Sequence, residues 1–218
     1  MIVRIVLSLL LLFVLGGVPS THGSPAVPFK AGDTWVYRVT ETAGTQPETS
    51  TLTVTYRGLV DYRGTAHHYA DAYSSSSPGE VERDILTWTG RYFRQRATIL
   101  YENSQRVLEI VFDRPYAFSG VQEELSGTTE IYERGQFVGR GLWTIEVVWQ
   151  GSSKVTVPAG TFTAEKWMGS LRIGRLAQDY TVYTVGALEI RADVDVRRDG
   201  ELTDRMRLEL EKGPVPKR

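Results

Sequence analysis

Residues 141–150, GLWTIEVVWQ, place a large apolar side chain at every second position. Successive side chains of an extended strand point to opposite faces, so one face of this stretch is apolar and the other is mainly polar. β-Branched and aromatic residues also favour strands. The stretch therefore predicts a β-strand, and it decides the fold class because the same alternation recurs along the chain. The side chains expected to share its apolar face are Trp143, Ile145, Val147 and Trp149.

The alternation recurs in residues 34–39 and 50–56. Trp35 and Tyr37 share one face of the first stretch, and apolar residues alternate with threonines in the second. Strands of this kind are typical of antiparallel sheets that are wetted on one side. About nine to eleven strands fit the chain at usual strand and loop lengths. The sequence predicts a mainly β fold: a strongly curved antiparallel sheet forming a half-barrel or open barrel, or alternatively a β-sandwich.

The last hairpin allows a prediction of register. If Gly200 lies at the centre of an odd-length loop, Asp195 faces Arg205 and the other polar pairs are also of opposite charge. A two-residue loop at Asp199-Gly200 would shift the pairing by one and place Asp195 against Asp204. Like charges directly opposite each other destabilise a sheet, and a one-residue slip inverts the faces. The sequence therefore predicts the register that pairs Asp195 with Arg205, with a loop of three or five residues.

The N-terminus has the order of a secretory signal peptide. A short basic start at residues 1–4 precedes an apolar run of 14 residues, and small and polar residues follow up to Gly23. A membrane-spanning helix needs about 20 apolar residues, so cleavage after residue 23 is expected rather than a retained membrane span. The predicted organisation is a signal peptide at 1–23, a linker at 24–30, one antiparallel β domain at 31–213 and a frayed tail at 214–218. The location expected is periplasmic or extracellular.

Composition narrows the function classes. The net charge is −1 over 218 residues, and no basic stripe indicates a nucleic-acid partner or an anionic membrane surface. The chain has no cysteine, which excludes disulfides, thiol chemistry and cysteine-ligated metals. Burial and hydrogen bonding must therefore stabilise the fold.

No set of residues indicates catalysis, a metal or a cofactor. His67 and His68 are adjacent, so in a strand they point to opposite faces and cannot easily share one metal. The acidic residues around Gly200 lack the spacing of a calcium loop and indicate a salt-bridged hairpin face. The remaining signal is aromatic. These side chains either fill the core or line a ligand cavity, and the candidate ligand-binding residues are Trp35, Tyr37, Trp143 and Trp149.

Two motifs carry a family resemblance. Residues 155–162, VTVPAGTF, and residues 32–37, GDTWVY, occur in the expected order, and residues 183–188 match a third motif in part. The chain resembles exported bacterial β-proteins of unknown function that include the TapB-like group. The resemblance implies the curved half-barrel of bacterial lipoprotein carriers, whose concave face takes acyl chains, and it implies no catalytic residues. The first motif itself has the chemistry of a structural hairpin that needs no ligand.

Three functions follow in order of support. The first is an exported, non-enzymatic module that binds a lipid, another apolar ligand or an envelope component in the hollow of the sheet. The second is a structural module that docks to an envelope protein through a sheet edge or loop. The third is a secreted hydrolase, which neither the histidines nor the spacing of the acids supports.

Overall fold

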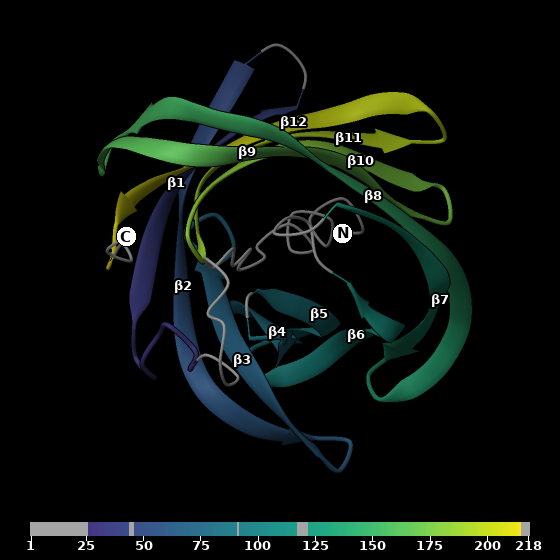
Figure 1. Ribbon diagram of the computed structural model, residues 1–218. Helices are drawn as coiled ribbons and strands as arrows, with labels where there is room; N and C mark the ends of the chain where they lie inside the picture. Colours follow the sequence, from purple (N-terminus) through teal and green to yellow (C-terminus); the bar gives the residue numbers. More distant parts are fainter. Residues whose placement is uncertain (1–25, 44–45, 91, 117–121, 215–218) are drawn as a thin grey trace.

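Twelve strands form a closed barrel in the computed structural model, which describes residues 26–43, 46–90, 92–116 and 122–214 (Figure 1). Each strand pairs antiparallel with the next along the chain, and the first pairs with the last. The strands are β1 (Thr34–Ala43), β2 (Gln46–Tyr62), β3 (Thr65–Ser74), β4 (Glu80–Trp88), β5 (Phe93–Glu102), β6 (Gln105–Tyr116), β7 (Glu123–Glu133), β8 (Gln136–Val157), β9 (Gly160–Ile173), β10 (Leu176–Val185), β11 (Leu188–Arg198) and β12 (Glu201–Lys212).

Closure of the sheet corrects the expected architecture. The prediction of a mainly β, antiparallel fold is confirmed, but the half-barrel and the sandwich are both wrong, because β1 pairs with β12 from Val36–Lys212 to Thr42–Arg205. This pairing satisfies backbone groups that an open sheet would leave exposed along its two edges. Alternation along single strands is the same in an open and a closed sheet, so it could not distinguish them.

The inner face of the barrel carries the main core. Alternate residues of every strand contribute to it, and the bulkiest of its fully buried side chains are aromatic. Trp35, Phe112 and Trp143 are each at most 1% exposed. Phe112 meets Tyr116 edge-on at 4.5 Å between ring centroids, and Tyr116 lies 5.3 Å from Trp143. The apolar faces predicted from the alternation thus form the inside of the barrel.

The β11–β12 hairpin combines a correct prediction with a wrong one. Asp195 lies opposite Arg205 as predicted, with 3.3 Å between the carboxylate and the guanidinium. The loop, however, is the two-residue Asp199-Gly200, whose φ angles of 52° and 86° suit a tight hairpin turn. A bulge after Val196 shifts the pairing back by one residue, so the tight turn and the charge-matched register coexist.

The segment at residues 155–162 is a hairpin, as predicted. Val155 and Val157 are each 5% exposed and belong to the inner core. At the tip between β8 and β9, the Ala159 amide donates to the carbonyl of Leu210 on β12 over 3.0 Å. The motif therefore ties the end of the longest hairpin to the last strand, which is a structural role.

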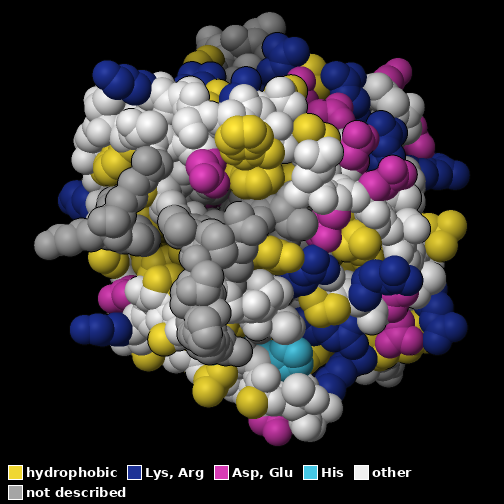
Figure 2. Space-filling view, viewed as in Figure 1, with side chains coloured by type: hydrophobic (Ala, Val, Ile, Leu, Met, Phe, Trp, Pro, Cys, Tyr) yellow, Lys and Arg dark blue, Asp and Glu magenta, His cyan; other side chains and the backbone are white. Residues whose placement is uncertain are grey.

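The outer face is salt-bridged and carries a second, smaller core. Charged side chains of both signs interleave on the side of the molecule at the right of Figure 2. Elsewhere on the outside, Ile85 and Ile99 are 1% and 4% exposed beneath a group of tyrosines. Arg63 lies over the rings of Tyr62 and Tyr132, at 5.6 and 5.0 Å from their centroids. These aromatic and basic side chains shield apolar residues that face away from the barrel interior.

The predicted signal peptide, residues 1–23, lies outside the described residues. Within the part of the chain that the structure describes, no helix has the length and apolar character needed to cross a membrane.

Candidate functional site

Three of the four predicted ligand-binding aromatics are integral to the inner core. Trp35, Tyr37 and Trp143 are 0%, 4% and 1% exposed. Their polar atoms are satisfied by protein groups, so the structure uses these side chains to hold the wall together. The hydrogen bonds are Trp35 Nε1 to Pro214 O at 2.9 Å, Tyr37 OH to Glu189 O at 3.0 Å, and Trp143 Nε1 to Asp113 Oδ1 at 3.1 Å.

Trp149 differs from the other three because it is 51% exposed. It pairs with Trp167 of β9, whose side chain belongs to the inner core, so the two share the inner face. The β7–β8 ladder ends at Glu123–Val147, two residues earlier. Within the described residues, Trp149 thus lies on the inner face two positions beyond the end of the β7–β8 ladder.

Two acidic residues on β4 form the least expected feature of the interior. Glu82 and Asp84 alternate with outward-facing neighbours and are 5% and 2% exposed. Their neighbours on β3 are small, because Ala72 pairs with Glu82 and Ala70 pairs with Asp84. We refer to Glu82 and Asp84 as the inner carboxyl pair.

A chain of hydrogen bonds holds one member of the pair. Tyr116 of β6 donates from its hydroxyl to Gln95 Oε1 over 2.8 Å. Gln95 then donates from Nε2 to Asp84 Oδ1 over 2.6 Å, and the hydroxyl of Thr98 donates to the same oxygen over 2.9 Å. Asp84 is therefore fixed through Oδ1, by residues of β5 that are themselves buried.

The other member of the pair is not held in this way. Both carboxyl oxygens of Glu82 are buried and accept no hydrogen bond from a described residue outside the pair, and the Glu82 carboxyl is hydrogen-bonded to that of Asp84. Neither Glu82 nor Asp84 takes part in a salt bridge of the described chain. Burial raises the pKa of Asp84 to about 8, and burial together with the charge of Asp84 raises the pKa of Glu82. Both shifts favour the protonated form, and a hydrogen bond between two carboxyl groups requires a proton on one of them.

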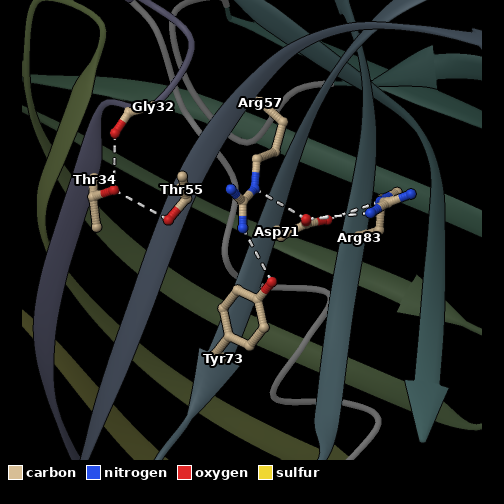
Figure 3. A network of polar contacts seen from close by, with 7 residues as sticks. All are labelled: Gly32, Thr34, Thr55, Arg57, Asp71, Tyr73 and Arg83. Atoms are coloured by element: carbon tan, nitrogen blue, oxygen red, sulfur yellow. Dashed lines mark hydrogen bonds and ion pairs between the residues drawn. The ribbon is translucent and has the colours of Figure 1, made fainter. Parts of the chain in front are cut away.

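Two buried carboxylates of the outer face, in contrast, have arginine partners. Asp71 lies between Arg57 and Arg83, with nitrogen–oxygen distances of 3.1 and 2.8 Å (Figure 3). The side chain of Glu109 is 1% exposed, contacts Arg63 and Arg106, and accepts a 2.7 Å hydrogen bond from the hydroxyl of a tyrosine. Buried charge is normally compensated in this manner. The absence of compensation at the inner carboxyl pair therefore distinguishes it from these two outer carboxylates.

A second set of unpartnered polar atoms lies at β8, β9 and β10. The indole nitrogen of Trp167 and the hydroxyl of Thr184 are buried, and neither has a hydrogen-bond partner among the described residues. The hydroxyl of Ser153 is in the same state. Trp167 is the cross-strand neighbour of Trp149, which connects this set to the exposed indole. Buried polar groups in native proteins normally have partners, so these atoms indicate where water or a ligand group binds.

The histidines lie on opposite faces of β3, as predicted. His68 Nδ1 is 2.6 Å from the hydroxyl of Tyr56, and its ring packs on Phe93 in the inner core. His67 packs edge-on against Tyr62 of the outer cluster. Burial lowers the pKa of both imidazoles. The described residues contain no group of three or more His, Asp or Glu side chains arranged to hold a metal ion.

The acidic face of the last hairpin is salt-bridged, as predicted. Asp193 contacts Arg191 and Arg207 at 2.8 and 2.6 Å. The inner carboxyl pair was missed, although residues 80–86, EVERDIL, alternate in a way that places Glu82 and Asp84 on the same face as Leu86. An acidic pair on the apolar face of a strand is the signal that would have found it.

Comparisons with known proteins give two structural likenesses. No family model matches the chain, and no curated protein matches it either. The chain is similar to a protein from Parabacteroides distasonis classed as a lipoprotein, with 13% identity over 85% of this chain and 96% of that chain and a TM-score of 0.46. It is also similar to an exported protein with a YmcC-like fold from Bacteroides fragilis, with 12% identity over 93% of this chain and 99% of that chain and a TM-score of 0.43.

Proposed function

We propose that the protein is exported and carries an apolar or amphipathic molecule inside the barrel, in the periplasm or outside the cell. The order of residues 1–23 supports export. Eight strands already suffice to enclose side chains or one small ligand, and the diameter of a barrel grows with the number of strands. A twelve-stranded barrel is wider than an eight-stranded one, which supports the proposal of a ligand inside it.

The observation that carries this proposal is the set of buried, unpartnered polar atoms on an otherwise apolar inner wall. The indole nitrogen of Trp167 and the hydroxyls of Ser153 and Thr184 are the members of this set. A purely structural core would contain apolar groups at these positions, because an unpartnered buried polar group costs about 1–3 kcal/mol. The small side chains of Ala70 and Ala72 beside Glu82 and Asp84 favour a ligand there.

The predicted aromatics have two roles in this proposal. Trp35, Tyr37 and Trp143 shape the wall and are held by their own hydrogen bonds. Trp149 is the one that a ligand would contact directly, because half of its surface is exposed on the inner face. Aromatic side chains contribute large apolar contact areas in such pockets.

The first test is ligand capture. The full chain is expressed in a bacterial host, purified from the periplasm and examined by native mass spectrometry, and the same sample is extracted with organic solvent. Binding of an uncharged apolar fluorophore, N-phenyl-1-naphthylamine, is then titrated. We expect an apolar adduct that is lost on denaturation, or saturable uptake of the fluorophore by the extracted protein. A bare polypeptide mass together with no uptake contradicts the proposal.

Two matched variants place the ligand. Ala72→Leu places a larger side chain on the inner face beside Glu82 and so reduces the space there. Thr53→Leu adds an apolar side chain of the same kind on the outer face of β2. We expect Ala72→Leu to weaken fluorophore binding at least tenfold and Thr53→Leu to leave it unchanged, with near-ultraviolet circular dichroism confirming the fold of both. Trp149→Ala, at an exposed position, should abolish energy transfer from that indole to the fluorophore without unfolding the protein.

A second candidate function is docking to an envelope protein. A groove of about 790 Å³ crosses the outer face of β8–β11, and Met168 in it is 42% exposed. Leu142 and Leu202, also on the described surface, are 74% and 40% exposed. This function gains support if the barrel captures no apolar molecule, and the groove is then the surface to mutate.

A further inference from the structure

We propose that the outer face of the barrel binds a phosphate or sulfate group at Arg96 of β5. The site is separate from the barrel interior and does not depend on the carrier function proposed above. The observation behind it is a partly buried guanidinium without an acceptor. Nη1 of Arg96 is enclosed by protein, and the side chain makes no hydrogen bond or ion pair with any described residue.

Arg96 differs in this respect from other arginines of the same face. Arg57 and Arg83 share the carboxylate of Asp71, at nitrogen–oxygen distances of 3.1 and 2.8 Å. A charge that is partly withdrawn from water costs free energy unless an opposite charge joins it. Since the described chain supplies no carboxylate to Arg96, an anion from outside the chain would be its partner.

Two further arginines lie near Arg96 around the ring of Tyr62. The guanidinium of Arg63, in the turn between β2 and β3, is 5.6 Å from the centroid of that ring. Arg106 of β6 contacts Glu109, which accepts the hydrogen bond from the tyrosine hydroxyl. Burial raises the pKa of this tyrosine, and the charges of Arg63, Arg106 and Arg96 oppose that rise. We refer to these three arginines as the basic cluster.

The acidic groups of the neighbourhood are bound by arginines other than Arg96. Glu109 contacts both Arg63 and Arg106, and its distance to the first is 3.6 Å. Glu130 lies 3.6 Å from Arg63 and has a further arginine at 3.1 Å. Arg96 is therefore the member of the basic cluster whose charge a bound anion would neutralise.

The donors of the basic cluster fit a tetrahedral oxyanion. A guanidinium carries five N–H donors in a planar fork that matches two oxygens of a phosphate or sulfate group. The side chains of Arg63 and Arg106 are 42% and 38% exposed, so they are accessible from solvent on the same face as Arg96. The oxygens of phosphate and sulfate point in several directions and can accept from more than one arginine, whereas those of a carboxylate lie in one plane.

His67 of β3 can report on this site. Its ring lies 5.9 Å from that of Tyr62, measured between centroids. Burial lowers the pKa of His67 and the charge of Arg96 lowers it further, while a backbone hydrogen bond and the charge of Asp61 act in the opposite direction. An anion bound at Arg96 should therefore raise the pKa of His67.

Inorganic phosphate is the first probe. The C2–H proton resonance of His67, assigned with the His67→Gln variant, is followed through the imidazole titration in chloride and in phosphate at the same ionic strength. We expect phosphate to raise the pKa of His67 by about 0.5. His68, which packs in the inner core, should respond much less. An equal pKa of His67 in the two salts overturns the inference.

Isothermal titration calorimetry at constant ionic strength then compares phosphate, sulfate and acetate. We expect phosphate and sulfate to bind at least tenfold more tightly than acetate, and equal binding of the three anions, as charge screening alone would give, overturns the inference. Glycerol 3-phosphate distinguishes the sources of the group. Affinity equal to that of inorganic phosphate supports a phosphate ester as the ligand, and weaker binding supports a free ion.

Variants locate the anion. Arg96→Gln should reduce phosphate affinity at least tenfold and remove the response of His67, whereas an unchanged affinity overturns the inference. Arg172→Gln is the matched control and should bind as the parent does, because Arg172 is an exposed arginine of β9 that also has no ion pair among the described residues.

Arg96→Lys provides a second measurement that keeps the positive charge. Lysine lacks the planar fork, so this variant should bind phosphate more weakly than the parent and more tightly than Arg96→Gln. Near-ultraviolet circular dichroism checks the fold of each variant. Uptake of N-phenyl-1-naphthylamine by the same samples tests the carrier function separately, and we expect it to be unchanged.

Discussion

Replacing Asp84 by asparagine should stabilise this protein at neutral pH, although the residue is 2% exposed and accepts two hydrogen bonds. Burial raises the pKa of Asp84 to about 8, so folding at pH 7 favours uptake of a proton by this carboxyl. Against an unfolded value of about 3.9, this costs up to about 4 kcal/mol at pH 7. Asparagine keeps an oxygen for Gln95 and Thr98 and has no charge to bury.

The pH dependence has a definite sign. A carboxyl whose pKa is raised on folding contributes stability that is complete below the unfolded value, near pH 4, and is lost as the pH rises to the folded value, near pH 8. The parent should therefore lose about 1.4 kcal/mol per pH unit from Asp84 within this window. Asp84→Asn should lack that contribution, so the two stability curves converge towards pH 4 and separate towards pH 8.

Urea unfolding of the parent and of Asp84→Asn at four pH values between 5 and 8 measures this difference. Asp71→Asn is the matched control, because Asp71 is also buried but bonds Arg57 and Arg83. Removing its charge deprives two guanidinium groups of their carboxylate and should destabilise the fold by about 1–3 kcal/mol. If Asp84→Asn destabilises the protein as Asp71→Asn does, the reasoning about the inner carboxyl pair is refuted.

Three further predictions concern the stability of the fold and are measured as changes in the free energy of unfolding. Gly169→Ala should cost about 1–3 kcal/mol, because a Cβ there would meet the backbone oxygen of Glu146 and lie 2.6 Å from the hydroxyl of Tyr180. An unchanged free energy of unfolding would show that β8 and β9 can move apart to accept the methyl group. Trp35→Phe should cost about 2–3 kcal/mol, since a ring at 0% exposure shrinks and its hydrogen bond to Pro214 is lost; an unchanged midpoint would contradict the role of that bond. Tyr62→Phe should cost about 1–2 kcal/mol, because Glu109, whose side chain is 1% exposed, loses the 2.7 Å bond from the tyrosine hydroxyl; a neutral result would mean that the nearby arginines suffice.

Much of the fold could be predicted from local pattern. Alternation identified the strands, and opposite charges identified the register of the last hairpin, because both depend on neighbouring residues. The length of the Asp199-Gly200 loop was missed since a bulge after Val196 corrects the register farther along. Closure was also missed, because β1 and β12 meet across almost the whole sequence and nothing in either strand specifies its partner.

The candidate site was predicted less well for a similar reason. Trp35, Tyr37 and Trp143 were assigned to the inner face correctly, but exposure depends on how neighbouring strands end. Among the described residues the β7–β8 ladder stops at Val147, two positions before the exposed Trp149, and the alternation of residues 141–150 cannot show where a ladder stops. The sequence could not single out Glu82 and Asp84, because the lack of a cation near them is visible only once the neighbouring strands are in place.

The pairing of β1 with β12 has a consequence for the order of events in folding. A ribosome makes β1 first and β12 last, so the first strand has only β2 as a lasting partner until nearly all of the chain has been made. Ring closure across such a sequence separation is slow because of its entropy. We therefore expect the barrel to close only late in synthesis, which is compatible with the export proposed above, because an exported polypeptide must stay unfolded while it crosses a membrane.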